Sequence, residues 1–338
     1  MTGRERVIAM MEGRPTGRLP FMPITMMFAA DRIGAKYSRY AKDHRVMAEA
    51  QLRVVEEFDI DSVSTISDPA REAADFGAEI EWFEDQPPAL IETRSLLSDR
   101  DRLRTLRPVD PLSGGRMHDR IQGVELLRRS VGNEKAVEGW VEGPCAEAAD
   151  LRGINRLMLD FHDAPEFVHE LFSFLIANAL ECARAQLAVG ADHIGVGDAA
   201  ASLVGPRIYE TFVWPYEKQL VDGIHAAGGR VRLHICGSIR RILERVAKLG
   251  CEMVDVDYPV PMLEARARMG PDQVVAGNLD PVNAVRNGTP ESITAALDEC
   301  WRAAGPRYIV GAGCEIVRDT PDENLRAMAC FARRGVSI

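Results

Sequence analysis

The chain has 338 residues, of which 46% are hydrophobic and 27% are charged, proportions typical of a globular protein with a large core. Its formal net charge of −10 is not offset by a basic stripe, which argues against a nucleic-acid partner. No apolar run approaches the roughly 20 residues of a membrane span, and the N-terminus lacks the pattern of a signal peptide, so we expect no membrane association and a cytoplasmic location.

Eight short apolar segments recur along the chain, and most of them end in a polar, glycine or cysteine residue. These predicted strands are Phe21 to Ile24, Ile60 to Ile66, Ala136 to Val141, His193 to Val196, Arg230 to Ile235, Met253 to Val256, Gln273 to Ala276 and Tyr308 to Val310. Helical periodicity lies between most of them, most clearly in Arg4 to Met11, His44 to Phe58, Pro165 to Val189, Pro206 to Ala227, Ile239 to Leu249 and Glu291 to Ala304. Alternating strands and helices are typical of right-handed βαβ units, and eight of them predict an α/β fold closed into a (β/α)8 TIM barrel, one domain over residues 1–338.

The stretch from Phe76 to Arg107 breaks this alternation. Residues Ala78 to Phe83 and Pro87 to Glu92 alternate with period two around a proline-containing turn, which predicts an antiparallel hairpin inserted after the second strand. We interpret the hairpin as a lid or an interface element, and a homodimer is one assembly that it would allow.

Two of the predicted strands end at soft metal ligands. His234 closes one strand and Cys236 follows it, while Cys314 follows the last strand. His234 and Cys236 are two residues apart and therefore point to the same side of a regular strand. The C-terminal ends of barrel strands form the mouth in which TIM-barrel active sites lie, so two thiols and one imidazole there predict a zinc site with one open position. Packing is the alternative, because a buried cysteine usually acts as a small hydrophobe.

Four further residues are candidates for the site. Asp198 ends the fourth strand, where it would orient a ligand, accept a proton or merely cap the following turn. Glu142 ends the third strand and would contribute to the fourth metal position or support the ligands from behind. Asn278 and Met26 are candidates for binding the cofactor. Asn278 is expected to fix a loop at the mouth, and Met26 would be an apolar contact for a methyl donor or the edge of a corrin ring, with core packing as the alternative.

At these residues the chain resembles the uroporphyrinogen decarboxylase superfamily, specifically its corrinoid-dependent methyltransferase branch. The most specific matches are Leu233 to Gly237, Ala276 to Pro281, and Gly313 to Cys314 followed by Thr320 to Leu325, and the resemblance covers nearly the whole chain. In that branch the His-X-Cys pair and the distant cysteine bind zinc, which the resemblance carries onto His234, Cys236 and Cys314. It also implies a TIM barrel and an enzyme of one-carbon metabolism that moves a methyl group between a corrinoid protein and a small molecule.

The chain has no Asp-X-His-X-X-Gly corrin-binding motif, so cobalamin is expected on a separate corrinoid protein that docks over the mouth. The small molecule would be a thiol, a folate, or a methoxy or methylamine compound. In the open position, zinc would hold a thiol as its thiolate or polarise the leaving atom of a methyl donor.

Two alternatives remain. Uroporphyrinogen decarboxylases carry an arginine-rich loop after the first strand, whereas Pro20 to Phe28 contains no arginine and the next one is Arg32. Because substrate carboxylates need cationic partners, this difference disfavours decarboxylation. The other alternative is a non-catalytic barrel in which the metal is structural.

Overall fold

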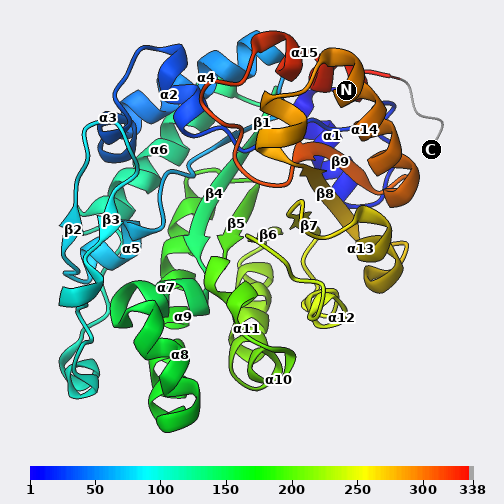
Figure 1. The fold of residues 1–338 in the computed structure, drawn as a ribbon. Coiled ribbons are helices and arrows are strands. Elements are labelled where there is room, and N and C mark those ends of the chain that lie inside the picture. Colours follow the sequence, from blue (N-terminus) through cyan, green and yellow to red (C-terminus); the bar gives the residue numbers. More distant parts are fainter. Residues whose placement is uncertain (335–338) are drawn as a thin grey trace.

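The structure, a computed structural model, describes residues 1–334, so the last four residues of the predicted domain lie outside the described part. Seven parallel strands form one curled sheet in the order β1-β4-β5-β6-β7-β8-β9, with helices around it (Figure 1). The strands of this sheet are β1 Ser62–Ser64, β4 Ala136–Glu142, β5 His193–Gly197, β6 Val231–Ile235, β7 Met253–Val256, β8 Val274–Leu279 and β9 Tyr308–Ala312.

The helices follow the strands in chain order, as the predicted βαβ units require. Their bounds are α1 Gly3–Met11, α2 Met27–Arg32, α3 Tyr37–Lys42, α4 His44–Phe58, α5 Ala70–Asp75, α6 Arg116–Val131, α7 Pro144–Arg152, α8 Ile154–Asp163, α9 Pro165–Ala188, α10 Pro206–Ile208, α11 Trp214–Ala226, α12 Leu243–Val246, α13 Met262–Met269, α14 Pro290–Ala304 and α15 Asp322–Ala332. Among the described residues, no helix combines the length and the apolar composition that a bilayer crossing requires.

The predicted first strand, Phe21 to Ile24, is reduced to a single parallel bridge between Phe21 and Val310. The amide of Met22 donates to the carbonyl of Val310 at 3.0 Å, and the amide of Asp61 donates to that of Phe21 at 2.9 Å, so the segment lies between β9 and the start of β1. Prolines at positions 20 and 23 remove two amide donors, which prevents a regular ladder. The predicted eight-stranded barrel is therefore confirmed only as a curled parallel sheet of seven strands.

The predicted hairpin from Ala78 to Glu92 is reduced to a two-residue antiparallel pair, β2 Ile80–Glu81 with β3 Ala89–Leu90. The turn between them is held against its own chain through Asp85. This carboxylate accepts hydrogen bonds from the backbone amide of Tyr37 and the ammonium of Lys36, both at 3.1 Å, and from Arg318 at 3.2 Å. A role in a homodimer stays a prediction.

Two of the predicted helices are interrupted. In the segment predicted as Ile239 to Leu249, only α12 is helical, because Ile239 and Ile242 form a tight turn (amide to carbonyl, 2.9 Å) that buries both side chains. The segment Pro206 to Ala227 contains a π turn at Tyr209–Val213. Pro215, just beyond this turn, has no backbone N–H and therefore cannot donate the α-helical hydrogen bond to the carbonyl four residues earlier.

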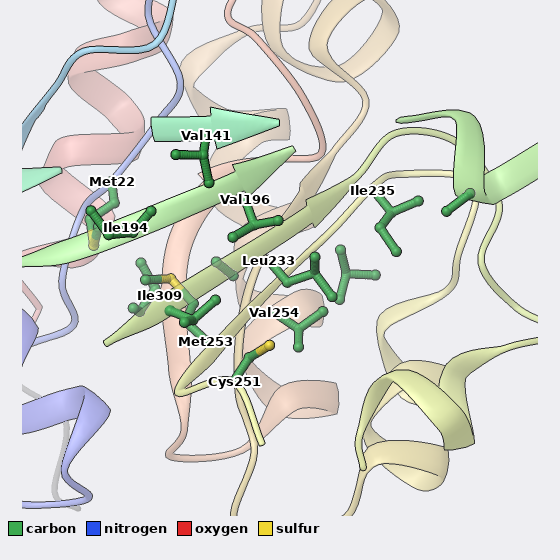
Figure 2. Close-up of a cluster of buried hydrophobic side chains, with 14 of the residues drawn as sticks. Met22, Val141, Ile194, Val196, Leu233, Ile235, Cys251, Met253, Val254 and Ile309 are labelled. Atoms are coloured by element: carbon green, nitrogen blue, oxygen red, sulfur yellow. The ribbon is translucent and has the colours of Figure 1, made fainter. Parts of the chain in front are cut away.

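The two faces of the curled sheet differ in chemistry. Apolar side chains from neighbouring strands, among them Val196, Leu233 and Val254, pack side by side on one face (Figure 2). The opposite face carries buried charges: Arg232 donates to Glu138 at 3.2 Å and to Asp255 at 2.6 Å. Because residues alternate between the two faces of a strand, the helix-covered core and the polar interior are built from the same strands.

Glycines on β5 make room for an aromatic side chain in the interior. A Cβ atom at Gly195 would lie 2.2 Å from Cε3 of Trp140. Gly195→Ala must therefore displace the indole, and we expect it to lower the free energy of unfolding by about 1–3 kcal/mol. Urea denaturation measures this, with Gly205→Ala as the control, because nothing lies within 4 Å of the added atom there. Equal losses for the two variants would contradict the packing argument.

Candidate metal centre

The C-terminal ends of β6 and β9 bring the three soft ligands together. Nε2 of His234 lies 3.0 Å from Sγ of Cys236 and 3.8 Å from Sγ of Cys314, and the two sulfur atoms are 3.9 Å apart. Tetrahedral zinc, with bonds of about 2.3 Å to sulfur and 2.0 Å to nitrogen, would hold its ligands about 3.5–3.8 Å apart. The triangle is close to this size, so small side-chain shifts would let one ion contact all three atoms. The residues fit zinc.

The carboxylate of Asp255 lies beside the imidazole nitrogen of His234 that faces away from the two sulfur atoms. The strand register pairs His234 on β6 with Asp255 on β7. Nδ1 of His234 lies 3.3 Å from Oδ2 of Asp255, close enough for an ion pair although not aligned as a hydrogen bond. A carboxylate at this position favours the tautomer whose Nε2 lone pair faces the metal.

The two thiols of the site are not equivalent. The hydrogen bond with Cys236 lowers the pKa of Cys314 to about 4, and the imidazole of His234 adds to this shift against the effect of burial. The same hydrogen bond raises the pKa of Cys236. Cys314 is therefore a thiolate at neutral pH, which is the form of cysteine that binds metal ions.

The ligands lie in the wall of a cavity of about 200 Å³. Ile24, Met26, Ile66 and Trp140 supply apolar lining, and the ionisable lining outside the triad is acidic. Those acidic residues are Asp68, Glu142 and Glu315. No arginine or lysine of the described chain lines this cavity. Such a lining accepts a small apolar group and offers no cationic partner to a substrate that bears several carboxylates.

Two of the four further candidates line the cavity and two do not. Glu142 and Met26 are part of the lining. Oε1 of Glu142 accepts a hydrogen bond from the indole of Trp140 at 3.0 Å, and burial raises the pKa of Glu142 well above its ordinary value. Asn278 instead donates to the carbonyl of Val260 at 2.5 Å. It thus fixes the loop after β7, as expected of a loop residue, and its place gives no support to cofactor binding.

Asp198 caps a helix. Its carboxylate accepts hydrogen bonds from the backbone amides of Ala146, at 2.6 Å, and Cys145, at 3.3 Å, both in the first turn of α7. A negative or hydrogen-bonding group at a helix N-terminus stabilises the helix. Its neighbours Gly197 and Ala199 line the cavity, so Asp198 holds that part of the wall in place without lining it.

The sequence interpretation missed Glu315, Trp140 and Asp68. Glu315 directly follows Cys314, and its Oε1 accepts from the amide of Met27 at 2.7 Å. Burial raises the pKa of Glu315 to about 7. The sequence signal for Trp140 is a bulky residue on one predicted strand and two glycines, Gly195 and Gly197, on the next. Because glycine has no side chain, these positions leave room for the indole ring.

The pH dependence of stability tests the environment of Asp198. Burial raises the pKa of Asp198 to about 7, against the lowering effect of its two amide hydrogen bonds. A raised pKa means that the folded state binds the proton more tightly, so the contribution to stability is full below about pH 4 and is lost as the pH rises through 7. Asp198→Asn keeps the cap, and we expect it to reduce the fall in unfolding free energy between pH 5 and 8 by up to about 1.4 kcal/mol per pH unit. Urea denaturation of both proteins at several pH values measures this, and parallel profiles would refute it.

The fold and the site together define an α/β protein with a triad of soft ligands at the carboxyl ends of its parallel strands. The chain belongs to the uroporphyrinogen decarboxylase (URO-D) family, whose sequence profile matches residues 2–335. The recognition of this family from the sequence is thereby confirmed.

Curated relatives have two different activities in their names. The uroporphyrinogen decarboxylase of Synechococcus sp. (strain CC9605) is 31% identical over 301 residues, which cover 86% of this chain and 82% of the relative. The methylcobamide:CoM methyltransferase MtbA of Methanosarcina mazei is 28% identical over 342 residues and 98% of both chains. Among solved structures, a methyltransferase from Methanosarcina mazei aligns with a TM-score of 0.87 over 98% of both chains, at 21% identity, which shows a shared fold.

Proposed function

We propose that this protein is a zinc-dependent methyltransferase that moves a methyl group between a corrinoid protein and a small molecule. The observation that carries the proposal is the triad of His234, Cys236 and Cys314 in the wall of a small cavity lined by apolar and acidic groups. The end-to-end match to a methylcobamide:CoM methyltransferase supports it and favours a thiol as methyl acceptor. Cobalamin would arrive on the partner protein.

Zinc held by the triad would supply a Lewis acid that keeps a thiol in its thiolate form at neutral pH. The residues around it have separate tasks. Asp255 orients the imidazole of His234, while Trp140 and Ile66 exclude water from the acceptor. Burial raises the pKa of Glu142, which favours its protonated form, and Glu142 is the group in the wall that would exchange a proton with the substrate.

The open position distinguishes a catalytic from a structural metal. In the described part of the chain, the triad has no fourth histidine, cysteine or carboxylate within 4.8 Å of all three ligand atoms. Structural zinc sites are usually closed by four protein ligands, whereas catalytic sites keep one position for substrate. Three ligands beside a cavity therefore favour the catalytic reading.

Uroporphyrinogen decarboxylase is the second candidate, favoured by relatives of that name at 30–31% identity. Against it stands the absence of lining arginine or lysine among the described residues, because the carboxylates of a porphyrinogen need cationic partners.

One assay separates these functions. The zinc-loaded protein is mixed with methylcobalamin and either coenzyme M or 2-mercaptoethanol, and loss of the cobalt–carbon absorbance is followed. Uroporphyrinogen is supplied in a parallel reaction. We expect thiol-dependent demethylation and no decarboxylation. Carboxyl loss from uroporphyrinogen without methyl transfer would establish the second candidate instead.

A further inference from the structure

Beside the cavity, buried carboxyl groups outnumber the cations near them. Glu142 ends β4, Glu72 lies on α5, and Glu147 and Asp150 lie on α7. Arg120 on α6, fully buried, is the cation that faces this group; it donates to Glu72 at 2.9 Å. One guanidinium can balance one carboxylate, so this acid cluster (Glu72, Glu142, Glu147 and Asp150) carries more acids than its cation can neutralise.

Several atoms of the acid cluster and of Arg120 have no hydrogen-bond partner among the described residues. They include both carboxyl oxygens of Glu147, which is 4% exposed, Oδ2 of Asp150, Oε2 of Glu72, and Nε and Nη2 of Arg120. A buried polar group without a partner costs about 1–3 kcal/mol. Internal water is the partner that suits such a polar site, because one molecule can bridge several donors and acceptors.

A bound cation does not explain the acid cluster. Among the described residues, two groups have ligand atoms close enough to share an ion, namely the metal triad and the surface group Asp43, His44 and Asp119. Neither contains a member of the acid cluster. Burial, and then the charge of Glu72, raise the pKa of Glu142, Glu147 and Asp150 well above their ordinary values, which favours their neutral, protonated forms.

The acid cluster runs from the cavity toward the surface. Glu142 is part of the cavity wall, Glu147 is buried, and Asp150 is partly exposed. Glu147 and Asp150 are three residues apart, so they share one face of α7. We propose that Glu142, Glu147 and Asp150, joined by internal water, form a proton path between the cavity and the solvent. This inference rests on the proposed function.

The proposed reaction releases a proton inside the cavity, and the path would carry it to solvent. When a thiol takes the methyl group, the sulfur–carbon bond forms as the cobalt–carbon bond breaks, the electron pair of that bond stays on cobalt, and the proton of the thiol must leave the cavity. A neutral carboxylic acid relays it by accepting a proton on one oxygen and releasing its own from the other. The proton reaches solvent at Asp150, and in the reverse direction the path returns it.

Glu147→Gln tests the path, because glutamine keeps the size of the side chain but cannot relay a proton. The first readout needs neither metal nor substrate: the infrared carbonyl band of protonated carboxyls at pH 7 should lose intensity in the variant. The second is stopped-flow proton release, followed with a pH-indicator dye after the zinc-loaded protein is mixed with coenzyme M. We expect release at least tenfold slower, with unchanged zinc content and an unchanged number of protons released.

Glu217→Gln is the matched control. Glu217 on α11 is as deeply buried as Glu147, its pKa is raised by burial, and one of its oxygens lacks a partner among the described residues. It lies outside the acid cluster, and its other oxygen accepts a hydrogen bond from Tyr209 at 2.5 Å. This control should lose infrared intensity and keep the parent rate of proton release. If Glu147→Gln does not fold, Asp150→Asn takes its place and should also slow release.

Release from Glu147→Gln at the parent rate, or an unchanged infrared band, would overturn the path. Absence of proton release from the parent protein would overturn the thiol chemistry and, with it, the task assigned to the path. The infrared result distinguishes these failures, because the loss of an acid band in the metal-free variant does not depend on methyl transfer.

Discussion

Replacing Cys314 with serine is expected to reduce bound zinc from roughly one ion per chain to a small fraction of that and to abolish methyl transfer. The hydroxyl is a poor substitute for the thiolate whose low pKa the site maintains. Even the outer partners of metal ligands contribute about 10- to 100-fold to affinity, so loss of a direct ligand should weaken zinc binding by more than about 100-fold. Elemental analysis after dialysis, with competition against a chromophoric chelator, measures both quantities.

Cys330→Ser is the control for this substitution, because Cys330 is an exposed thiol on α15 away from the cavity lining. It should bind zinc as the parent protein does. His234→Ala should resemble Cys314→Ser, since the two side chains contribute to the same triad. Full zinc binding by either triad variant would rule out the site.

Arg232→Met is expected to cause the largest loss of stability. The Arg232 guanidinium is 2% exposed and lies between the carboxylates of Glu138 and Asp255. Without it, the two buried carboxylates lose the guanidinium that they share and keep only the imidazoles of His193 and His234 as basic neighbours, and removing one partner of a buried ion pair costs about 3–5 kcal/mol. Urea denaturation of the metal-free protein gives the change in unfolding free energy.

Two further variants make this result interpretable. Arg240→Met removes a surface ion pair with Glu264, at 2.6 Å, and should cost less than about 1 kcal/mol, because solvent screens such pairs. Glu138→Gln introduced together with Arg232→Met should recover part of the loss, since it removes one unbalanced charge. A double variant no more stable than Arg232→Met alone would show that lost packing, and not charge, is the cause.

The ligand triad could be predicted from sequence because its geometry is local to strands. Residues two apart on a strand share a face, and a parallel sheet gathers its strand ends at one edge. The same rule explains the different placement of two other candidates. Glu142 pairs in register with Gly197, and Gly197 with His234, so all three face the interior. Asp198, one residue further, points the other way.

The elements that were predicted wrongly depend on backbone details that hydrophobic patterns do not show. The segment Phe21 to Ile24 has the composition of a strand, but its prolines limit it to one bridge. The spacing of Ile239 and Ile242 predicts two apolar residues on the same face of a helix. In the structure they lie in a tight turn, and both side chains are buried there. The acid cluster was missed because its members come from β4, α5 and α7, and only the tertiary fold brings them together.

The anchoring of the hairpin has a consequence for how the site is assembled. Asp85 accepts hydrogen bonds from both Tyr37 and Arg318. Pro87, two positions further along the chain, lines the cavity together with Ile24 and Cys314. The wall of the pocket therefore stays unfinished during synthesis until Cys314, Glu315 and Arg318 have left the ribosome. A fragment that stops short of Arg318 would lack the hydrogen bond to Asp85 and also helix α15, which packs against α14 and β9, so we expect such a truncation to disrupt the pocket.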